Sequence, residues 1–342
     1  MIEFNEADIK NLIFHRISNQ NEKCYVSINE YAFSSIEEVE VFKKIFLKPF
    51  VNHATTYEFK HEIDLELNPL FKLSKAIFEK GDFIIRSHDI HQHLKSVSKH
   101  PNIKDGDLFI VNYDNIQLND VAYKALGIYK IENKESFIET ITSDTGATGL
   151  QFRQGIGTRK PDKACLILFT DEPYTILTID NGSTEADYWQ NEFIKINLKN
   201  DDINSTNQFL TLTKTFLTEQ LPSDFNVSKA DQIDLLNRSV DYFKTHESFN
   251  KGEFEQEVFH HENIISSFRN FDDTYSQQNE LDKTDGFLIS PQAVKKQARV
   301  FKTVLKLDRN FHIYIHGDRE LIEQGVDEKG RKFYKLYFKE ES

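Results

Sequence analysis

The spacing of apolar residues changes near residue 203, and this change limits the possible fold more than any other feature of the sequence. Before it, runs such as KACLILFT (163–170) and YTILTID (174–180) are rich in β-branched and aromatic residues, as buried strands are. After it, apolar residues recur every three or four positions, which is the period of a helix. The pattern predicts three successive helices, within 206–221, 228–247 and 252–275.

The part before residue 200 combines strand and helix signals. DIKNLIFHRI (8–17) predicts a strand, and 107–113 with 121–131 predict a hairpin. An amphipathic helix is expected over 34–50, capped by Ser34 or Ser35. A second helix is expected to begin at Pro69 after the N-cap Asn68, and to bend or break near Gly81. The glycine-bearing stretch 143–163 is expected to be a loop.

The last part of the chain predicts a small sheet. Segments 298–308, 310–317 and 332–338 alternate apolar and polar residues and suggest a three-stranded antiparallel meander, preceded by a polar loop over 274–286. We therefore predict an α+β protein: antiparallel sheet with flanking helices in residues 1–200, then a helical segment and a small C-terminal antiparallel sheet in residues 201–342.

Composition limits the partners and the compartment. The formal net charge of −13 opposes diffuse attraction to DNA or anionic membranes, so nucleic-acid contacts would need a local basic patch. The two cysteines, Cys24 and Cys165, form no CxxC motif, and we expect no disulfide. The first residues lack a signal-peptide pattern, and no run approaches 18 apolar residues. We expect a cytoplasmic protein without membrane contact.

Two histidines near the C-terminus lie on one face of a predicted strand. His312 and His316 alternate with apolar residues in LKLDRNFHIYIHGD. Four strand residues separate them by roughly 13 Å, whereas each imidazole that binds a zinc ion must approach it to about 2 Å. One metal ion cannot join them, and we predict that this pair binds none.

Two further groups have the residue types of a metal site but no completing motif. RSHDIHQHLK places His88, His91 and His93 with Asp89 on neighbouring faces of a helix, where a solvated surface is the simpler interpretation. HEIDLELN is expected to be a strand with Glu62, Asp64 and Glu66 on one face, close after Glu58 and Lys60. Clustered carboxylates with a lysine suit a magnesium-dependent nuclease, although a polar strand face explains them as well.

Two segments concentrate positive charge and are candidate nucleic-acid contacts. The first is the glycine-bearing loop around GIGTRK, which lacks phosphate-loop spacing and carries Arg153, Arg159, Lys160 and Lys163. The second is PQAVKKQARVFKTVLKLDRN, which carries Lys295, Lys296, Arg299, Lys302, Lys306 and Arg309. In its strand portion Lys302 and Lys306 share a face opposite Phe301 and Leu305. Cations spaced along such a surface can follow a phosphate backbone without reading bases.

The order of several segments resembles one protein family. The C-terminal run ARVFKTVLKLDRNFHIYIHGDRELIEQGVDEKGRKFYKLYF, with KHPNIKDGDLFIVNY, QFRQGIGTRKPDKACLILF and DYWQNEFIKINLKNDDINSTNQFLTLTKTFLTEQLP, is similar to the bacterial NdpA-type (YejK-like) nucleoid-associated proteins. The resemblance begins near residue 60. It implies a cytoplasmic protein of the nucleoid that binds DNA, with no cofactor and no catalytic residues to transfer.

No nucleophile motif or dinucleotide fingerprint is present in the sequence. We therefore predict non-specific DNA binding through the basic segments, without enzymatic activity, cofactor or bound metal. Two alternatives stay open at this point. One is a metal-dependent nuclease or another nucleic-acid-processing enzyme, and the other is an adaptor that binds nucleoid proteins.

Overall fold

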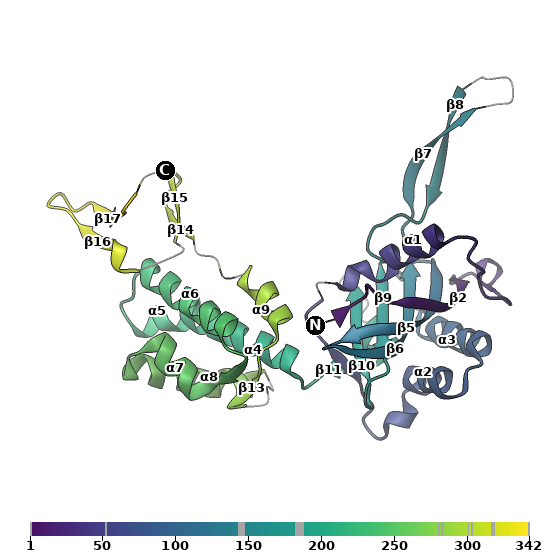
Figure 1. Cartoon of the computed structure of the whole chain (residues 1–342), viewed down its shortest axis with the longest axis horizontal. Helices are drawn as coiled ribbons and strands as arrows, with labels where there is room; N and C mark the ends of the chain where they lie inside the picture. Colours follow the sequence, from purple (N-terminus) through teal and green to yellow (C-terminus); the bar gives the residue numbers. More distant parts are fainter. Residues whose placement is uncertain are drawn as a thin grey trace. The chain divides into compact units, whose positions relative to one another are not determined.

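A computed structural model describes residues 2–51, 53–142, 148–181, 188–279, 281, 284–299, 301, 304–315 and 319–340. The chain divides into two compact units, residues 1–199 and 200–342 (Figure 1). Each unit has its own hydrophobic clusters of buried residues.

The first unit is built on an antiparallel sheet. Its strand order is β11-β4-β10-β9-β6-β5-β2-β3, and β1 also pairs with β5. Its strands are β1 (Ile2–Glu3), β2 (Asp8–Ile17), β3 (Tyr25–Val26), β4 (Tyr57–Phe59), β5 (Gly106–Leu118), β6 (Val121–Ile131), β9 (Lys163–Leu168), β10 (Thr175–Asp180) and β11 (Ile196–Leu198). The predicted strand at 8–17 and the predicted hairpin of β5 with β6 are confirmed.

Helices cover both faces of this sheet, because successive strand residues point to opposite sides. They are α1 (Ile36–Phe46), α2 (Pro69–Lys80) and α3 (Phe83–Val97), with the 3-10 helices η1 (Asn21–Lys23), η2 (Lys48–Phe50) and η3 (Leu65–Leu67) and the π-helix η4 (Tyr188–Ile194). Ile110 and Ile128 pack with α2 and α3, whereas Val111 and Tyr129 pack with α1 (Figure 1).

The predicted helix caps of the first unit are confirmed. The Ser35 hydroxyl accepts a hydrogen bond from the Glu38 amide at 3.3 Å at the start of α1. The buried Asn68 side chain accepts from the amides of Leu70 and Phe71 before Pro69. Gly81, with φ +81°, separates α2 from α3 as expected, because glycine adopts this conformation without a steric penalty.

The strand expected at 61–68 does not form. β4 ends at Phe59, a bend follows, and η3 begins after Asp64. The Asp64 side chain accepts from the Glu66 amide at 2.9 Å, which is a local bond that competes with strand pairing. Glu62, Asp64 and Glu66 therefore do not line one strand face.

A separate two-stranded ribbon replaces part of the loop expected over 143–163. β7 (Glu135–Thr142) pairs with β8 (Thr148–Gly155) from Glu135 opposite Gly155 to Thr142 opposite Thr148. The ribbon projects from the sheet of the first unit (Figure 1). Residues 143–147 lie outside the described part of the chain.

The second unit is mainly helical. Its elements are α4 (Asp202–Thr215), the π-helix η5 (Phe216–Gln220), α5 (Leu221–Asp224), α6 (Lys229–Thr245), α7 (Lys251–Phe259), α8 (Glu262–Gln278) and α9 (Pro291–Ala298), with the paired strands β12 (Ser248–Asn250) and β13 (Gly286–Leu288). Ser228 caps α6 through a reciprocal bond pair with Asp231, which confirms that prediction. Phenylalanines such as Phe209, Phe216 and Phe254 dominate the core.

Two helix boundaries differ from the sequence prediction. The third helix expected over 252–275 is two helices, since the backbone between α7 and α8 takes a left-handed turn at His260, with φ +58°. α8 then continues to Gln278, into the stretch expected to be a loop.

The C-terminal strands form two hairpins, and not one three-stranded meander. β14 (Val304–Leu307) pairs with β15 (Phe311–Tyr314), and after the 3-10 helix η6 (Arg319–Leu321), β16 (Ile322–Val326) pairs with β17 (Lys332–Leu336). Positive φ at Asp308 and at Gly330 permits a turn in each hairpin. β16 lies outside the three strands that the sequence predicted. The α+β class, with a large antiparallel sheet, a helical segment and small C-terminal antiparallel pairs, is confirmed.

Among the residues that the structure describes, none of the helices is both long and apolar enough to cross a membrane.

Candidate nucleic-acid interface

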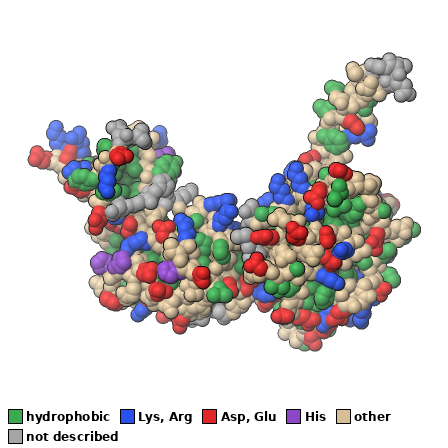
Figure 2. All heavy atoms as spheres, in the orientation of Figure 1, with side chains coloured by type: hydrophobic (Ala, Val, Ile, Leu, Met, Phe, Trp, Pro, Cys, Tyr) green, Lys and Arg blue, Asp and Glu red, His purple; other side chains and the backbone are tan. Residues whose placement is uncertain are grey.

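The basic C-terminal segment begins with exposed cations on α9. Ser290 caps this helix, and Ala293 and Val294 bury its inner side against the core of the second unit. Lys295 and Lys296 are exposed in the last turn, and Arg299 is exposed directly after it. Figure 2 shows Lys and Arg side chains gathered over the region of α9.

The hairpin of β14 and β15 adds two further cations. Lys306 is exposed opposite His312, whereas the preceding Leu305 is buried, as strand alternation predicts. Arg309 is exposed in the turn. On the face of Lys306 and His312, the Tyr314 side chain is also exposed, by 64%. Lys302 and His316 lie outside the described residues, so the predicted positions of both stay predictions.

These cations are close together in the sequence and share a lack of ion-pair partners among the described residues. No carboxylate of the described residues forms an ion pair with any member of the set Lys295, Lys296, Arg299, Lys306 and Arg309. Elsewhere in the second unit, Arg238, Lys251, Arg269 and Arg319 each pair with a carboxylate. An unpaired surface cation is free to neutralise a phosphate without first breaking an internal contact.

The basic residues 153–163 of the first unit, in contrast, mostly form ion pairs with carboxylates. Arg153, on β8, pairs with Glu139 across the ribbon at 2.5 Å. Arg159 is 69% exposed and lies 3.9 Å from Glu135, and Lys160 is exposed. These residues remain accessible, but Arg153 would have to exchange its partner to contact a phosphate.

Lys163 is not a loop cation. It is the first residue of β9, it is 3% exposed, and its ammonium donates to Asp180 at 2.5 Å, 5.1 Å from the ring centroid of Tyr188. The neighbouring Lys130 is fully buried beside Glu132, and burial lowers its pKa. A phosphate cannot reach Lys163 through this packing, so the prediction that Lys163 is an accessible cation of the glycine-bearing loop is wrong.

The histidines of α3 support the fold and do not form a solvated face. His88, His91 and His93 each bond through Nε2 to a backbone carbonyl, of Ser27, Arg16 and Phe193 respectively. His91 packs edge-on against the fully buried His15, whose Nδ1 accepts from the Ser27 amide. Burial, followed by the charges of His91 and His88, lowers the pKa of His15 to about 3.

The carboxylates that suggested a nuclease, Asp64 and Glu66, form separate contacts. Asp64 caps η3, and Glu66 pairs with Lys75 at 2.9 Å, which also pairs with Glu172. Asp64 thus bonds to the local backbone and Glu66 to a side chain of α2, and among the described residues these carboxylates are not part of a group of three or more potential metal ligands.

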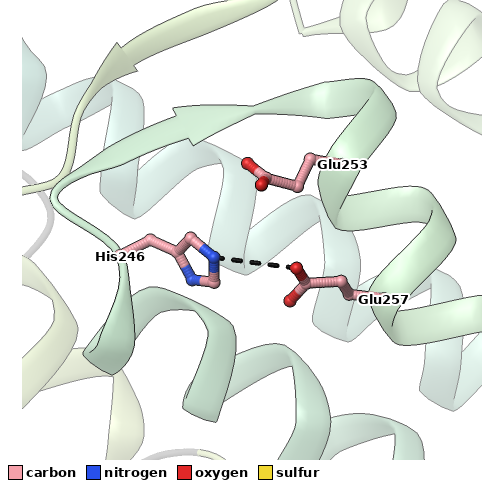
Figure 3. A group of neighbouring side chains, drawn as sticks. All are labelled: His246, Glu253 and Glu257. Atoms are coloured by element: carbon pink, nitrogen blue, oxygen red, sulfur yellow. Dashed lines mark ion pairs between the residues drawn. The ribbon is translucent and has the colours of Figure 1, made fainter.

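One group of potential ligands was missed by the sequence reasoning. His246, Glu253 and Glu257 have ligand atoms that all lie within 4.8 Å of one another (Figure 3). The two glutamates stand one turn apart on a helix, a spacing that is visible in the sequence. Nothing local connects them with His246, because the intervening strand β12 sets that distance.

The fold and this surface define a two-unit α+β protein with a set of accessible, unpaired cations on its helical unit. The family described as nucleoid-associated protein YejK matches residues 13–334. The chain therefore belongs to that family, and the resemblance seen in the sequence is confirmed. No curated protein matches the chain.

Proposed function

We propose that this protein binds DNA directly and without base specificity, through the cations of α9 and the β14–β15 hairpin, as a non-enzymatic protein of the cytoplasmic nucleoid. Membership of a nucleoid-associated family supports the location. The observation that carries the proposal is the unpaired set Lys295, Lys296, Arg299, Lys306 and Arg309 in a chain of net charge −13.

Charge explains why binding would be local. A chain with 55 acidic and 42 basic side chains repels phosphate over most of its surface. Attraction is then restricted to places where cations gather without neighbouring carboxylates. Contacts with phosphate fix position on the duplex but carry no sequence information, so we expect similar affinity for unrelated sequences.

Neutralising two cations of this surface tests the proposal. Each phosphate that a cation neutralises contributes about 0.9 to the slope of log affinity against log salt. The double variant Lys295→Gln/Lys306→Gln should therefore flatten this slope by about 2 on duplex DNA and weaken binding on any sequence. Fluorescence anisotropy at several salt concentrations measures both quantities.

A matched control separates local contact from net charge. Lys23→Gln/Lys72→Gln changes the net charge equally, at exposed lysines of the first unit, and should leave the slope unchanged. If the folded Lys295→Gln/Lys306→Gln variant kept both affinity and slope, the surface would not be the DNA site. Capture of nucleoid proteins without DNA affinity would then favour the adaptor alternative.

The loop cations Arg159 and Lys160 are proposed as a weaker second contact, because they are exposed but lie near Glu135. The non-enzymatic part of the proposal is supported by the separate contacts of Asp64, which caps η3, and Glu66, which pairs with Lys75. Cleavage of DNA with Mg²⁺ that Glu62→Ala or Asp64→Ala abolishes would favour the nuclease alternative.

A further inference from the structure

The corner between α6 and α7 brings one histidine and two glutamates together. In the sequence, these residues are separate from the cations of the proposed DNA-binding surface. His246 is the residue that ends α6, with extended backbone angles that turn the chain into β12. Asn250 then caps α7 by accepting from the Glu253 amide at 3.0 Å. This cap fixes where α7 begins, and so fixes where Glu253 and Glu257 stand. Figure 3 shows both glutamate side chains extending from α7 toward the imidazole.

The distances between the three ligand atoms are close to those that a metal ion requires. His246 Nε2 lies 3.7 Å from Glu257 Oε1, and the three ligand atoms lie within 4.8 Å of one another. Bonds of about 2.0–2.2 Å in a tetrahedron place neighbouring ligand atoms about 3.4 Å apart. Rotation about the flexible glutamate side chains can make up the difference, while the imidazole stays in place.

The hydrogen bonds of the imidazole decide which nitrogen faces the glutamates. His246 Nδ1 lies 3.0 Å from the Tyr242 carbonyl oxygen, which can only accept, so Nδ1 carries the hydrogen. In the neutral ring Nε2 then presents a lone pair toward two carboxylates. Lone pair and carboxylates repel one another unless a positive charge stands between them, and that charge is either a proton or a metal ion. A carbonyl behind the opposite nitrogen is the usual arrangement of a metal-binding histidine.

Tyr242 holds two of the three residues in place. Its ring stacks on the imidazole of His246 with centroids 4.1 Å apart, and its hydroxyl donates to Glu253 at 3.1 Å. The Tyr242 side chain is buried, so its ring and hydroxyl are held in place by packing. One side chain thus orients both a nitrogen and an oxygen ligand.

We propose that His246, Glu253 and Glu257 bind a divalent transition-metal ion, with Zn²⁺ the best match, and with Tyr242 as a positioning residue. One imidazole and two carboxylates suit Zn²⁺ better than Mg²⁺ or Ca²⁺, which favour oxygen ligands alone. The site remains open to water, because the side chains of His246 and Glu257 are 28% and 50% exposed. It joins the end of α6 to α7, so a bound ion stabilises this corner of the second unit.

Titration of the full-length, EDTA-treated protein with ZnCl₂ tests the proposal. Isothermal calorimetry should show one ion bound per chain, and the melting temperature should rise with zinc, because a ligand of the native state stabilises it. Co²⁺ in place of Zn²⁺ should give the visible absorption of a tetrahedral nitrogen and oxygen site. His246→Ala and Glu257→Gln should each abolish the absorption and weaken binding at least about tenfold, since each removes a ligand.

Tyr242→Phe distinguishes positioning from folding. It keeps the stacked ring and removes the hydroxyl, which donates to Glu253 and also accepts from the Asn250 amide. Zinc affinity should fall by about 10-fold or more, and the rise of the melting temperature with zinc should be smaller than in the unmodified chain, each measured from its own metal-free value. Glu247→Gln and His312→Ala remove an exposed acid and an exposed histidine outside the group, and should leave zinc binding unchanged. Metal-free circular dichroism spectra verify the fold of each variant.

Two results would overturn the proposal. Absence of zinc binding to the unmodified chain would show that a proton alone joins His246 to Glu257. Zinc binding that His246→Ala and Glu257→Gln leave unchanged would place the ion elsewhere. Neither result bears on DNA binding, which the salt titration tests separately.

Discussion

Buried histidines illustrate how single residues depend on the rest of the fold. His15 on β2 is fully buried, its Nδ1 accepts from the Ser27 amide, and its Nε2 lies 3.1 Å from the Ser87 hydroxyl on α3. The ring can make both bonds only in its neutral form, because a protonated ring has no acceptor. Burial also lowers the pKa of His91, which packs against it.

We predict that His15 makes the protein sensitive to mild acid. Its pKa is about 3 when folded and about 6.5 in an unfolded chain. Because the folded value is the lower one, the unfolded state binds the proton first as the pH falls. The contribution of neutral His15 to the free energy of unfolding is therefore complete above about pH 6.5. Below that pH it decreases by up to about 1.4 kcal/mol per pH unit.

Urea unfolding at pH 7.5, 6 and 5 measures this dependence. The unmodified chain should lose stability more steeply between pH 6 and 5 than His15→Asn, which cannot titrate. Equal slopes in the two proteins would show that His15 does not control the response to acid.

The ribbon of β7 and β8 forms no strand pairing with the main sheet among the described residues. Among the described residues its strands pair only with each other, and every residue from Ser136 to Thr142 is exposed. Ile138, Leu150 and Phe152 lie on one face of the ribbon, and are 64%, 72% and 68% exposed. A two-stranded ribbon gains little stability alone in water, so it contributes little to the core.

We predict that residues 136–154 can be removed without unfolding the first unit. Glu135 and Gly155 are opposite each other at the base of the ribbon, so two glycines can join them as a tight turn. The melting temperature of the shortened protein should stay within a few degrees of the original, because no buried core residue is lost. A protein that no longer unfolds cooperatively would show that the ribbon stabilises the sheet.

At the scale of the whole molecule, the two units have independent cores. The cores of the sheet unit lie between residues 2 and 196, and those of the helical unit lie between 209 and 322. Each unit also falls in the usual size range of an independent domain.

We predict that residues 1–199 and 200–342 each fold when produced separately. Circular dichroism should show a strand-rich spectrum for the first fragment and a helix-rich spectrum for the second, and each should melt cooperatively. A fragment that is unfolded alone but folds when mixed with the other would contradict this independence.

Local chemistry in the sequence determined most of the elements. Ser35, Asn68 with Pro69, and Ser228 mark helix starts, because each side chain satisfies amide groups only two or three residues away. Runs rich in β-branched and aromatic residues indicated β5, β6, β9 and β10, because such side chains favour an extended backbone whatever the strand pairs with. The exposed cations of α9 were also identified from their sequence alone.

Contacts between distant segments were decided only by the tertiary structure. Lys163 is buried because β9 pairs with β6 on one side and β10 on the other, which brings Asp180 and Tyr188 to its ammonium. His246 meets Glu257 because β12 returns the chain beside the end of α6. Periodicity and helix caps depend only on residues that are neighbours in the sequence. Contacts such as Lys163 with Asp180 and His246 with Glu257 depend on which elements bury their apolar faces against each other, and a local sequence pattern does not determine that.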